Sequence, residues 1–329
     1  MQTEDEVFAF LDTDVTIPLR DDGKITTLMV NSGKSLTVDL AGHTINTQAY
    51  AFYVNGGELT IRDSSGKGKI TASALNKAYP AVFVNSDGVC TMESGIVDTS
   101  EVEVPEGSHN WLYGVACSGN GIFNMTGGQL ITKDAAGISI TNGTASGEGA
   151  QFNISGDAVI TSKDGTAIYL ADNKEVNISE NAVIDGGILV RLGDINVSGN
   201  AVVNGHELGS DIYPLGKLVC TSGCSSHDAA ILALTGCYNS SLGNDLNINI
   251  SGSAKVNGYI NNGVDIATLN TKYDQTVNVN IDKSSNVTAA EDIWNVYNHD
   301  QLAEMATEQG KSLPAEANTT TLTIKVDGS

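Results

Sequence analysis

The chain has few prolines, few aromatic residues and few charged residues. Proline occurs 5 times in 329 residues and aromatic residues make up 5%, whereas glycine occurs 36 times. The mixture of alanine, leucine, glutamate and lysine found in helical proteins is also thin in the middle of the chain, where Asn, Thr, Ser, Val and Ile dominate. This composition argues against a largely helical protein and is typical of short strands joined by turns.

Basic residues are scarce as well: 17 Lys and Arg stand against 39 Asp and Glu, a formal net charge of −22. Such a surface repels phosphates and anionic lipids, so we expect no nucleic-acid partner and no membrane insertion. No apolar run reaches the roughly 18 residues of a transmembrane helix. The opening stretch MQTEDEVFAFLDTD lacks the basic-then-apolar order of a signal peptide. We therefore expect use without classical secretion, or a leader upstream of this sequence.

Cysteines are few and unevenly spaced. They are Cys90, Cys117, Cys220, Cys224 and Cys237, an odd set that does not predict a disulfide framework. Cys220, Cys224, His227 and Cys237 are the candidate zinc ligands, because zinc is held by thiolates and imidazoles. Their spacing, C-x3-C-x2-H-x9-C, differs from the recognised zinc signatures. We therefore predict small, semi-apolar core cysteines, with no metal and no cofactor.

A short motif recurs along the sequence: an apolar residue, Asn or Thr, a second apolar residue, then Ser or Thr. It is clearest in VNISENAVIDG (176–186) and INVSGNAVVNG (195–205), which are 19 residues apart. Its central residues are 37, 60, 91, 124, 153, 177, 196, 249 and 280. A period of about 20–50 residues is typical of solenoids and propellers. The step of 53 residues after 196 predicts an insertion, or a degenerate extra unit, at about 205–246.

A second set of apolar segments keeps step with this motif, for example AFYV (51–54), AVFV (81–84) and AIYL (167–170). Each unit therefore carries at least two short alternating strands. A unit of 19 residues is too short for a four-stranded propeller blade but long enough for one turn of a parallel β-helix with three strands. Gly, Asn and Asp at the ends of the units suit its tight corners, because they tolerate positive φ.

The stretches MVNSGKSLTVDLAGHTINT and GGELTIRDSSGKGKI resemble the opening turns of right-handed β-helix proteins of the pectate-lyase-like superfamily. The resemblance covers residues 25–290 and implies an all-β fold, a single right-handed parallel β-helix solenoid. Phage tail spikes and fibres share this architecture, as do many bacterial surface proteins. It is therefore architectural and carries little functional specificity.

The ends of a solenoid need caps, because a terminal turn exposes sheet edges. We predict an N-terminal cap at 1–30, the β-helix at 31–290, and a C-terminal cap or docking segment at 291–329. In the last segment, Asn298 as N-cap and Gln301 at N3 predict a short helix that ends near Gly310. The following TTTLTIKVDG predicts a strand.

Three aspartates stand at similar places in successive units: Asp134, Asp164 and Asp185. Because stacked turns lie about 4.8 Å apart, such carboxylates would approach the spacing of about 5–10 Å found in glycosidases. A polysaccharide lyase or glycosidase is therefore one alternative. Against it, Asp before Gly is ordinary turn chemistry. A pectate-lyase-type site also implies Arg or Lys near calcium-binding acids, and the few arginines of this chain lie in no obvious acid cluster.

The motif also matches the N-glycosylation pattern at Asn124, Asn153, Asn177, Asn196 and Asn249. Because these sites coincide with the structural repeat, we predict a ladder of stacked asparagine amides instead.

Apolar side chains at outward positions are the more informative candidates for a function. Four apolar residues of the second set of segments alternate with the inward columns and should form an exposed interface stripe: Tyr53, Phe83, Tyr169 and Leu189. In the strands that follow the Asn motif, alternation likewise places apolar residues outward: Leu130, Val159, Val183 and Val202. The loop SEVEVPEGSHNWLYG (100–114) adds His109 and Trp111 as a possible sugar or partner site; a mobile acidic loop with one anchoring tryptophan is the alternative.

These features favour a non-enzymatic structural or adhesive protein, first of all a phage virion component such as a fibre, spike or decoration protein. It would bind other virion proteins, further copies of itself in a trimer, or a host-surface polysaccharide. Two alternatives stay open. One is a bacterial cell-surface adhesin, which a leader upstream of Met1 would favour, and the other is the polysaccharide lyase or glycosidase.

Overall fold

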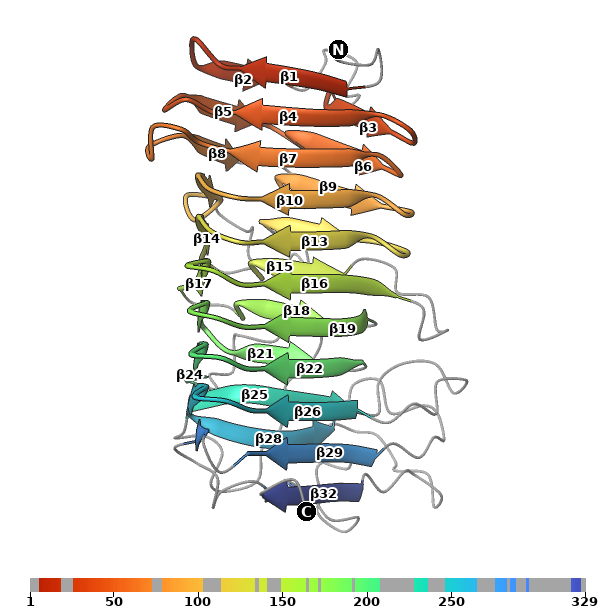
Figure 1. Cartoon of the computed structure of the whole chain (residues 1–329), viewed down its shortest axis with the longest axis vertical. Coiled ribbons are helices and arrows are strands. Elements are labelled where there is room, and N and C mark those ends of the chain that lie inside the picture. Colours follow the sequence, from red (N-terminus) through yellow and green to blue (C-terminus); the bar gives the residue numbers. More distant parts are fainter. Residues whose placement is uncertain are drawn as a thin grey trace, which may run out of the picture.

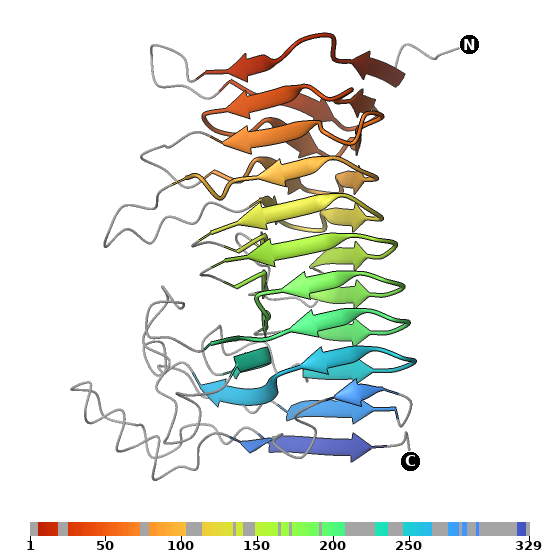
Figure 2. The same cartoon turned by 90° about the vertical axis from the view of Figure 1, so that its left-hand side faces the viewer.

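The structure is a computed structural model in which every element of the described residues is a strand (Figure 1). It describes residues 6–18, 26–72, 79–102, 114–133, 136–140, 149–163, 166–170, 173–190, 193–207, 228–235, 246–264, 276–282, 285–287, 294–295 and 321–326. Nearly all strands pair in parallel, and they form three sheets that run the length of the molecule (Figures 1 and 2).

Apart from β24, which lies off the path, each sheet takes every third strand of the chain. Sheet A consists of β1 (Glu6–Phe10), β4 (Ser35–Asp39), β7 (Glu58–Arg62), β10 (Val89–Met92), β13 (Ile122–Met125), β16 (Ala150–Ile154), β19 (Asn173–Ile178), β22 (Asp194–Val197), β26 (Leu246–Ile250), β29 (Thr276–Ile281) and β32 (Thr321–Val326). Sheet B consists of β2 (Val15–Ile17), β5 (Thr44–Thr47), β8 (Lys69–Ala72), β11 (Ile96–Asp98), β14 (Gln129–Thr132), β17 (Val159–Ser162), β20 (Val183–Asp185), β23 (Val202–Asn204), β27 (Lys255–Asn257) and β30 (Asn286–Val287). Sheet C consists of β3 (Leu28–Asn31), β6 (Phe52–Asn55), β9 (Val82–Asn85), β12 (Val115–Cys117), β15 (Ile138–Ile140), β18 (Ile168–Leu170), β21 (Ile188–Val190), β25 (Asp228–Thr235), β28 (Tyr259–Val264) and β31 (Trp294–Asn295), and β24 (His206–Glu207) pairs with β25 in the antiparallel sense.

One coil of the solenoid contributes one strand to each sheet, in the order A, B, C. In Figure 1 the strands of sheet A run from right to left in front, and those of sheet C run from left to right behind them as the chain descends. The coil is therefore right-handed, the usual hand for parallel crossovers. The prediction of an all-β, single right-handed parallel β-helix is confirmed.

The strand register follows the sequence repeat. Thr60 lies opposite Thr91, Asn124 opposite Asn153, and Asn177 opposite Asn196. Across the long step of 53 residues, Asn196 lies opposite Asn249. Only one strand of sheet B lies between β22 and β26 on the path through the sheets. The long step is therefore one coil with an insertion and not a degenerate extra coil.

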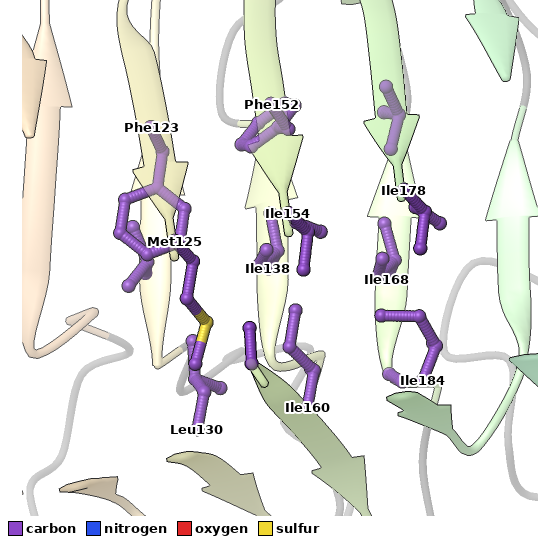
Figure 3. Packing of buried hydrophobic residues seen from close by; sticks show 14 of the residues in the cluster. Phe123, Met125, Leu130, Ile138, Phe152, Ile154, Ile160, Ile168, Ile178 and Ile184 are labelled. Carbon is purple, nitrogen blue, oxygen red and sulfur yellow. The ribbon is translucent and has the colours of Figure 1, made fainter. Parts of the chain in front are cut away.

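The repeated segment VNISENAVI shows how each position is used. Val176, Ile178, Ala182 and Ile184 are buried in the core, and the residues between them face outward. Equivalent residues of neighbouring coils stack on one another, so the interior is a set of continuous apolar columns. Figure 3 shows Phe123, Phe152 and Ile178 among the side chains of this interior. Most of the hydrophobic free energy of such a fold comes from this burial.

Asparagine side chains form the predicted ladder on the outer face of sheet A. Five amides donate from Nδ2 to the Oδ1 of the asparagine one coil earlier, at 2.7–2.9 Å, and the first, that of Asn124, donates to Oγ1 of Thr91 at 3.5 Å. The ladder consists of Asn124, Asn153, Asn177, Asn196, Asn249 and Asn280. These hydrogen bonds account for the Asn of the motif without glycosylation.

The outward phase predicted for Leu130 is wrong. Leu130 is fully buried and lies in register with Ile160, while Gln129 is the counterpart of Val159. The reason is the corner before the strand: three residues separate β13 from β14, whereas four separate β16 from β17. Val159, Val183 and Val202 do point outward, where they are half-buried.

The two ends of the chain are described in part. The residues predicted as N-terminal cap, 1–30, include β1 and β2, which pair in parallel with the second coil. The strand predicted in TTTLTIKVDG is confirmed as β32, which pairs with β29. The predicted helix between Asn298 and Gly310 lies outside the described residues.

Candidate functional site: an aromatic cluster on the outer face of sheet C

Four aromatic side chains gather on the outer face of sheet C in the second and third coils. Tyr53 on β6 and Phe83 on β9 are register partners, with ring centroids 5.1 Å apart. Tyr50 stacks on Phe83 at 5.5 Å and meets Tyr53 edge-on at 5.7 Å. Tyr79 closes the group, 5.0 Å from Tyr50. We call these four residues the aromatic cluster.

Strand alternation places the cluster on the outside. Phe52 and Val54 on β6 are fully buried in the core, so Tyr53 between them must face outward. The same holds for Phe83 between Val82 and Val84. Each ring is half-buried and so keeps accessible surface.

Polar groups frame the cluster. Asn85 donates from Nδ2 to the hydroxyl oxygen of Tyr53 at 3.1 Å and to Oδ1 of Asn55 at 3.4 Å. Burial, helped by the nearby phenols of Tyr79 and Tyr53, raises the pKa of Tyr50 to about 12. Tyr50 is therefore an uncharged phenol at neutral pH. The cluster combines apolar ring faces with uncharged donors and acceptors.

The predicted interface stripe is only partly present. Tyr53 and Phe83 are accessible, and Met29, the register partner of Tyr53, is 55% exposed. Further along the same column, Tyr169 and Leu189 are only 8% and 2% exposed. The chain itself covers these two side chains, so the expectation of one continuous exposed stripe is wrong. The accessible part is confined to the first coils.

Two residues of the cluster, Tyr50 and Tyr79, were missed by strand periodicity because they precede their strands. A signal was present: QAYAFYV and KAYPAVFV both place Ala-Tyr just before the apolar strand. The loop candidates His109 and Trp111 lie outside the described residues.

Of the three aspartates considered as catalytic acids, the structure describes only Asp185. Asp185 lies opposite Thr161 and Asn204 in sheet B. Neither register partner of Asp185 is therefore a second carboxylate. Asp134 and Asp164 themselves lie outside the described residues.

The candidate zinc ligands Cys220, Cys224, His227 and Cys237 lie outside the described residues. In the part of the chain that the structure describes, no three His, Cys, Asp or Glu side chains are grouped to hold a metal ion. Cys90 and Cys117 are buried free thiols in the core, and burial raises the pKa of both. The described residues contain no helix that is long and apolar enough to span a membrane.

Two buried aspartates fix the corner between sheets A and B near the cluster's coils. Asp63 accepts hydrogen bonds from the backbone N–H of Gly68 at 2.7 Å and of Gly42 at 2.8 Å. Asp39 accepts from the N–H of Ser64 at 2.9 Å and from Nε of Arg62 at 3.2 Å. Because they tie successive coils together, these carboxylates have a structural role.

Replacing Asp63 by Asn should lower the free energy of unfolding at pH 7 by about 1–3 kcal/mol. Burial alone would raise the pKa of Asp63, but the hydrogen bonds from Gly68 and Gly42 outweigh it, and the pKa is lowered. A lowered pKa stabilises the fold above the unfolded-state value of about 3.9, and this contribution disappears as the pH falls through the folded-state value. In urea titrations the difference between wild type and Asp63→Asn should therefore shrink below about pH 4.

Asp87→Asn is the matched control for this prediction, because Asp87 is exposed and accepts one side-chain hydrogen bond, from Asn120. It should change the free energy of unfolding by less than about 1 kcal/mol at pH 7. A pH-independent difference for Asp63→Asn would contradict the role given to its charge.

No protein-family model, no curated protein and no solved structure matches this chain, so its parallel β-helix is defined by its own strand pairing.

Proposed function

We propose that the protein is a non-enzymatic adhesive β-helix protein that binds saccharide through the aromatic cluster. The observation that carries the proposal is the aromatic cluster itself. Its four accessible rings are joined by four ring contacts with centroids 5.0–5.7 Å apart, and the amides of Asn55 and Asn85 lie beside them. A rigid solenoid underneath fixes the rings in place before any ligand arrives, which lowers the entropy lost on binding.

Saccharide suits this surface chemically. The C–H faces of a pyranose are weakly positive, and the faces of aromatic rings carry the negative part of a quadrupole. Phenol and amide groups beside the rings supply hydrogen bonds to the sugar hydroxyls, and a few placed polar groups in an apolar site are typical of small-ligand recognition. The −22 net charge favours neutral over acidic glycans as ligands.

A phage virion is the location we propose, with the protein as a fibre, spike or decoration component. This part of the proposal rests on the resemblance of MVNSGKSLTVDLAGHTINT and GGELTIRDSSGKGKI to the solenoids of pectate-lyase-like proteins, an architecture that tail spikes and fibres share. A bacterial surface adhesin would use the same cluster in the same way, and differs only in where the protein is displayed.

The test is binding to immobilised bacterial surface polysaccharides, capsules and O-antigens, for wild type and for the double variant Tyr53→Ala/Phe83→Ala. Loss of two stacking rings should weaken binding at least tenfold, about 1.4 kcal/mol. Val89→Ser, on the outer face of sheet A, is the control and should bind as wild type does. Equal binding by the double variant would refute the site, and release of reducing ends from any glycan of the panel would refute the non-enzymatic assignment.

A further inference from the structure

The rings of the aromatic cluster do not form one flat platform. Tyr50 and Phe83 lie nearly parallel, with 28° between their ring planes and 5.5 Å between their centroids. Tyr53 is inclined to both rings, by 53° to Phe83 and by 76° to Tyr50. Tyr79 stands at 69° to Tyr50. The cluster therefore presents rings in more than one orientation, one shared by Tyr50 and Phe83 and another set by Tyr53.

Strand register and a hydrogen bond hold the angle between Tyr53 and Phe83. The two residues are register partners on neighbouring coils, so their backbones are separated by the spacing of parallel strands, about 4.8 Å. Asn85, which lies on the same strand as Phe83, donates from Nδ2 to the hydroxyl oxygen of Tyr53 at 3.1 Å. This bond ties the far end of the Tyr53 ring to the strand that carries Phe83. A ligand therefore meets the angle already formed and loses little entropy in fixing it.

The distance between these two rings suits adjacent sugars of one chain. The ring centroids of Tyr53 and Phe83 are 5.1 Å apart. A pyranose is similar in size to a benzene ring, so sugars that contact these two side chains are neighbours, with no residue between them. A sugar that lies flat on Tyr53 meets the Tyr50–Phe83 pair at a steep angle, because the ring planes differ by 53° and 76°. Both ring orientations are contacted face-on only if adjacent sugars are themselves inclined to each other.

We propose that the aromatic cluster selects glycans whose chain turns between adjacent sugars and discriminates against flat, ribbon-like chains. This selectivity rests on the proposed saccharide function. In a β-1,4-linked glucan both chain bonds of each sugar are equatorial, so the chain is a flat ribbon that lies face-on against rings of one orientation. In an α-1,4-linked glucan one of these bonds is axial, which turns the chain and inclines successive sugar faces. Such a chain contacts Tyr53 and the Tyr50–Phe83 pair together, and the additional ring contact strengthens binding.

The polar groups beside the rings leave this selection to shape. The hydroxyl of Tyr53 accepts its hydrogen bond from Asn85, so its own hydrogen remains available to donate to a sugar hydroxyl. Asn55 and Asn85 each lie two residues after an aromatic residue on the same strand, and alternation places them on the same outer face. Phenols and amides are uncharged at neutral pH. The cluster therefore distinguishes neutral glycans by the course of the chain and not by charge.

Isothermal titration calorimetry of the full chain with maltopentaose and cellopentaose tests the proposal, because these pentasaccharides contain the same sugar and differ in linkage alone. Maltopentaose, the α-1,4-linked chain, should bind at least about fivefold more tightly than cellopentaose, the β-1,4-linked chain, which corresponds to one additional ring contact. Glucose is too small to contact both ring orientations and should bind more weakly than maltopentaose. Equal affinity for the two pentasaccharides, or tighter binding of cellopentaose, would overturn the proposal.

Tyr53→Ala is the decisive variant, and it should abolish the preference by lowering the affinity for maltopentaose to that for cellopentaose. Tyr53→Phe keeps the ring and should retain the preference, and Val89→Ser should bind as wild type does. A preference that survives in Tyr53→Ala contradicts the role given to the inclined ring. Failure of both pentasaccharides to bind, while bacterial polysaccharides still bind through Tyr53 and Phe83, overturns this selectivity alone. Failure to bind any glycan refutes the saccharide site and the selectivity with it.

Discussion

Replacement of Gly156 by alanine should lower the free energy of unfolding by about 2–5 kcal/mol, the sum of a left-handed backbone penalty and a steric penalty. Gly156 has a φ of +61° at the corner between β16 and β17, where a Cβ atom would collide with the carbonyl oxygen of Thr126 in the preceding coil. Both partners in this collision are backbone, so no side-chain rotation can relieve it. Urea unfolding followed by circular dichroism would measure the change.

Gly33→Ala provides the matched control. Gly33 has a φ of +74°, but no atom lies within 4 Å of the place where its Cβ would be. Alanine there carries only the backbone penalty, about 1–2 kcal/mol. If both substitutions cost the same, the close stacking of coils at the Gly156 corner is wrong. Because each coil contacts only its neighbours, hydrogen exchange should show the damage near β13, β16 and β19 first.

The same corner shows why the sequence predicts this fold so well. Four successive coils place a residue with positive φ at this corner: Gly156 at +61°, Glu180 at +57°, Gly199 at +67° and Gly252 at +65°. Glu180 is tolerated where glycine is expected, and its carboxylate accepts a hydrogen bond from the N–H of Gly156 at 2.8 Å. Regular corners keep the apolar columns in register, and a periodic sequence therefore reveals both the columns and the ladder.

Prediction fails where that regularity breaks. Leu130 was given the wrong face because its corner is one residue shorter than those after it. Tyr169 and Leu189 point outward as the pattern requires, but they are covered by the chain, which strand alternation alone cannot foresee. The aromatic cluster was half predicted: Tyr53 and Phe83 follow from alternation, whereas Tyr50 and Tyr79 join through space from positions before the strands. Local periodicity gives a residue's face, and contacts across coils decide its accessibility.

Replacement of Phe152 by alanine should lower the free energy of unfolding by about 3–5 kcal/mol. Phe152 is fully buried on β16 and lies beside Phe123 of the preceding coil (Figure 3). Its register partner in the following coil is Val176. Removing the ring leaves a cavity in the middle of the solenoid, and coils on either side cannot close it without breaking their own register. Equilibrium unfolding in urea, with hydrogen exchange to locate the affected strands, would measure the loss.

Gln151→Ala is the control. Gln151 precedes Phe152 on the same strand but faces outward, so the comparison separates the loss of a buried side chain from the effect of a substitution in β16. Its amide donates one hydrogen bond, from Nε2 to Oδ1 of Asn153 at 3.3 Å, so its loss should cost no more than about 1 kcal/mol. Equal losses for the two variants would mean that β16 does not alternate as described. A large loss of unfolding free energy for Phe152→Ala alone, with faster exchange confined to β13, β16 and β19, would show that the interior column holds neighbouring coils together. The outer amide ladder would then fix the register of the strands and contribute the smaller part of the stability.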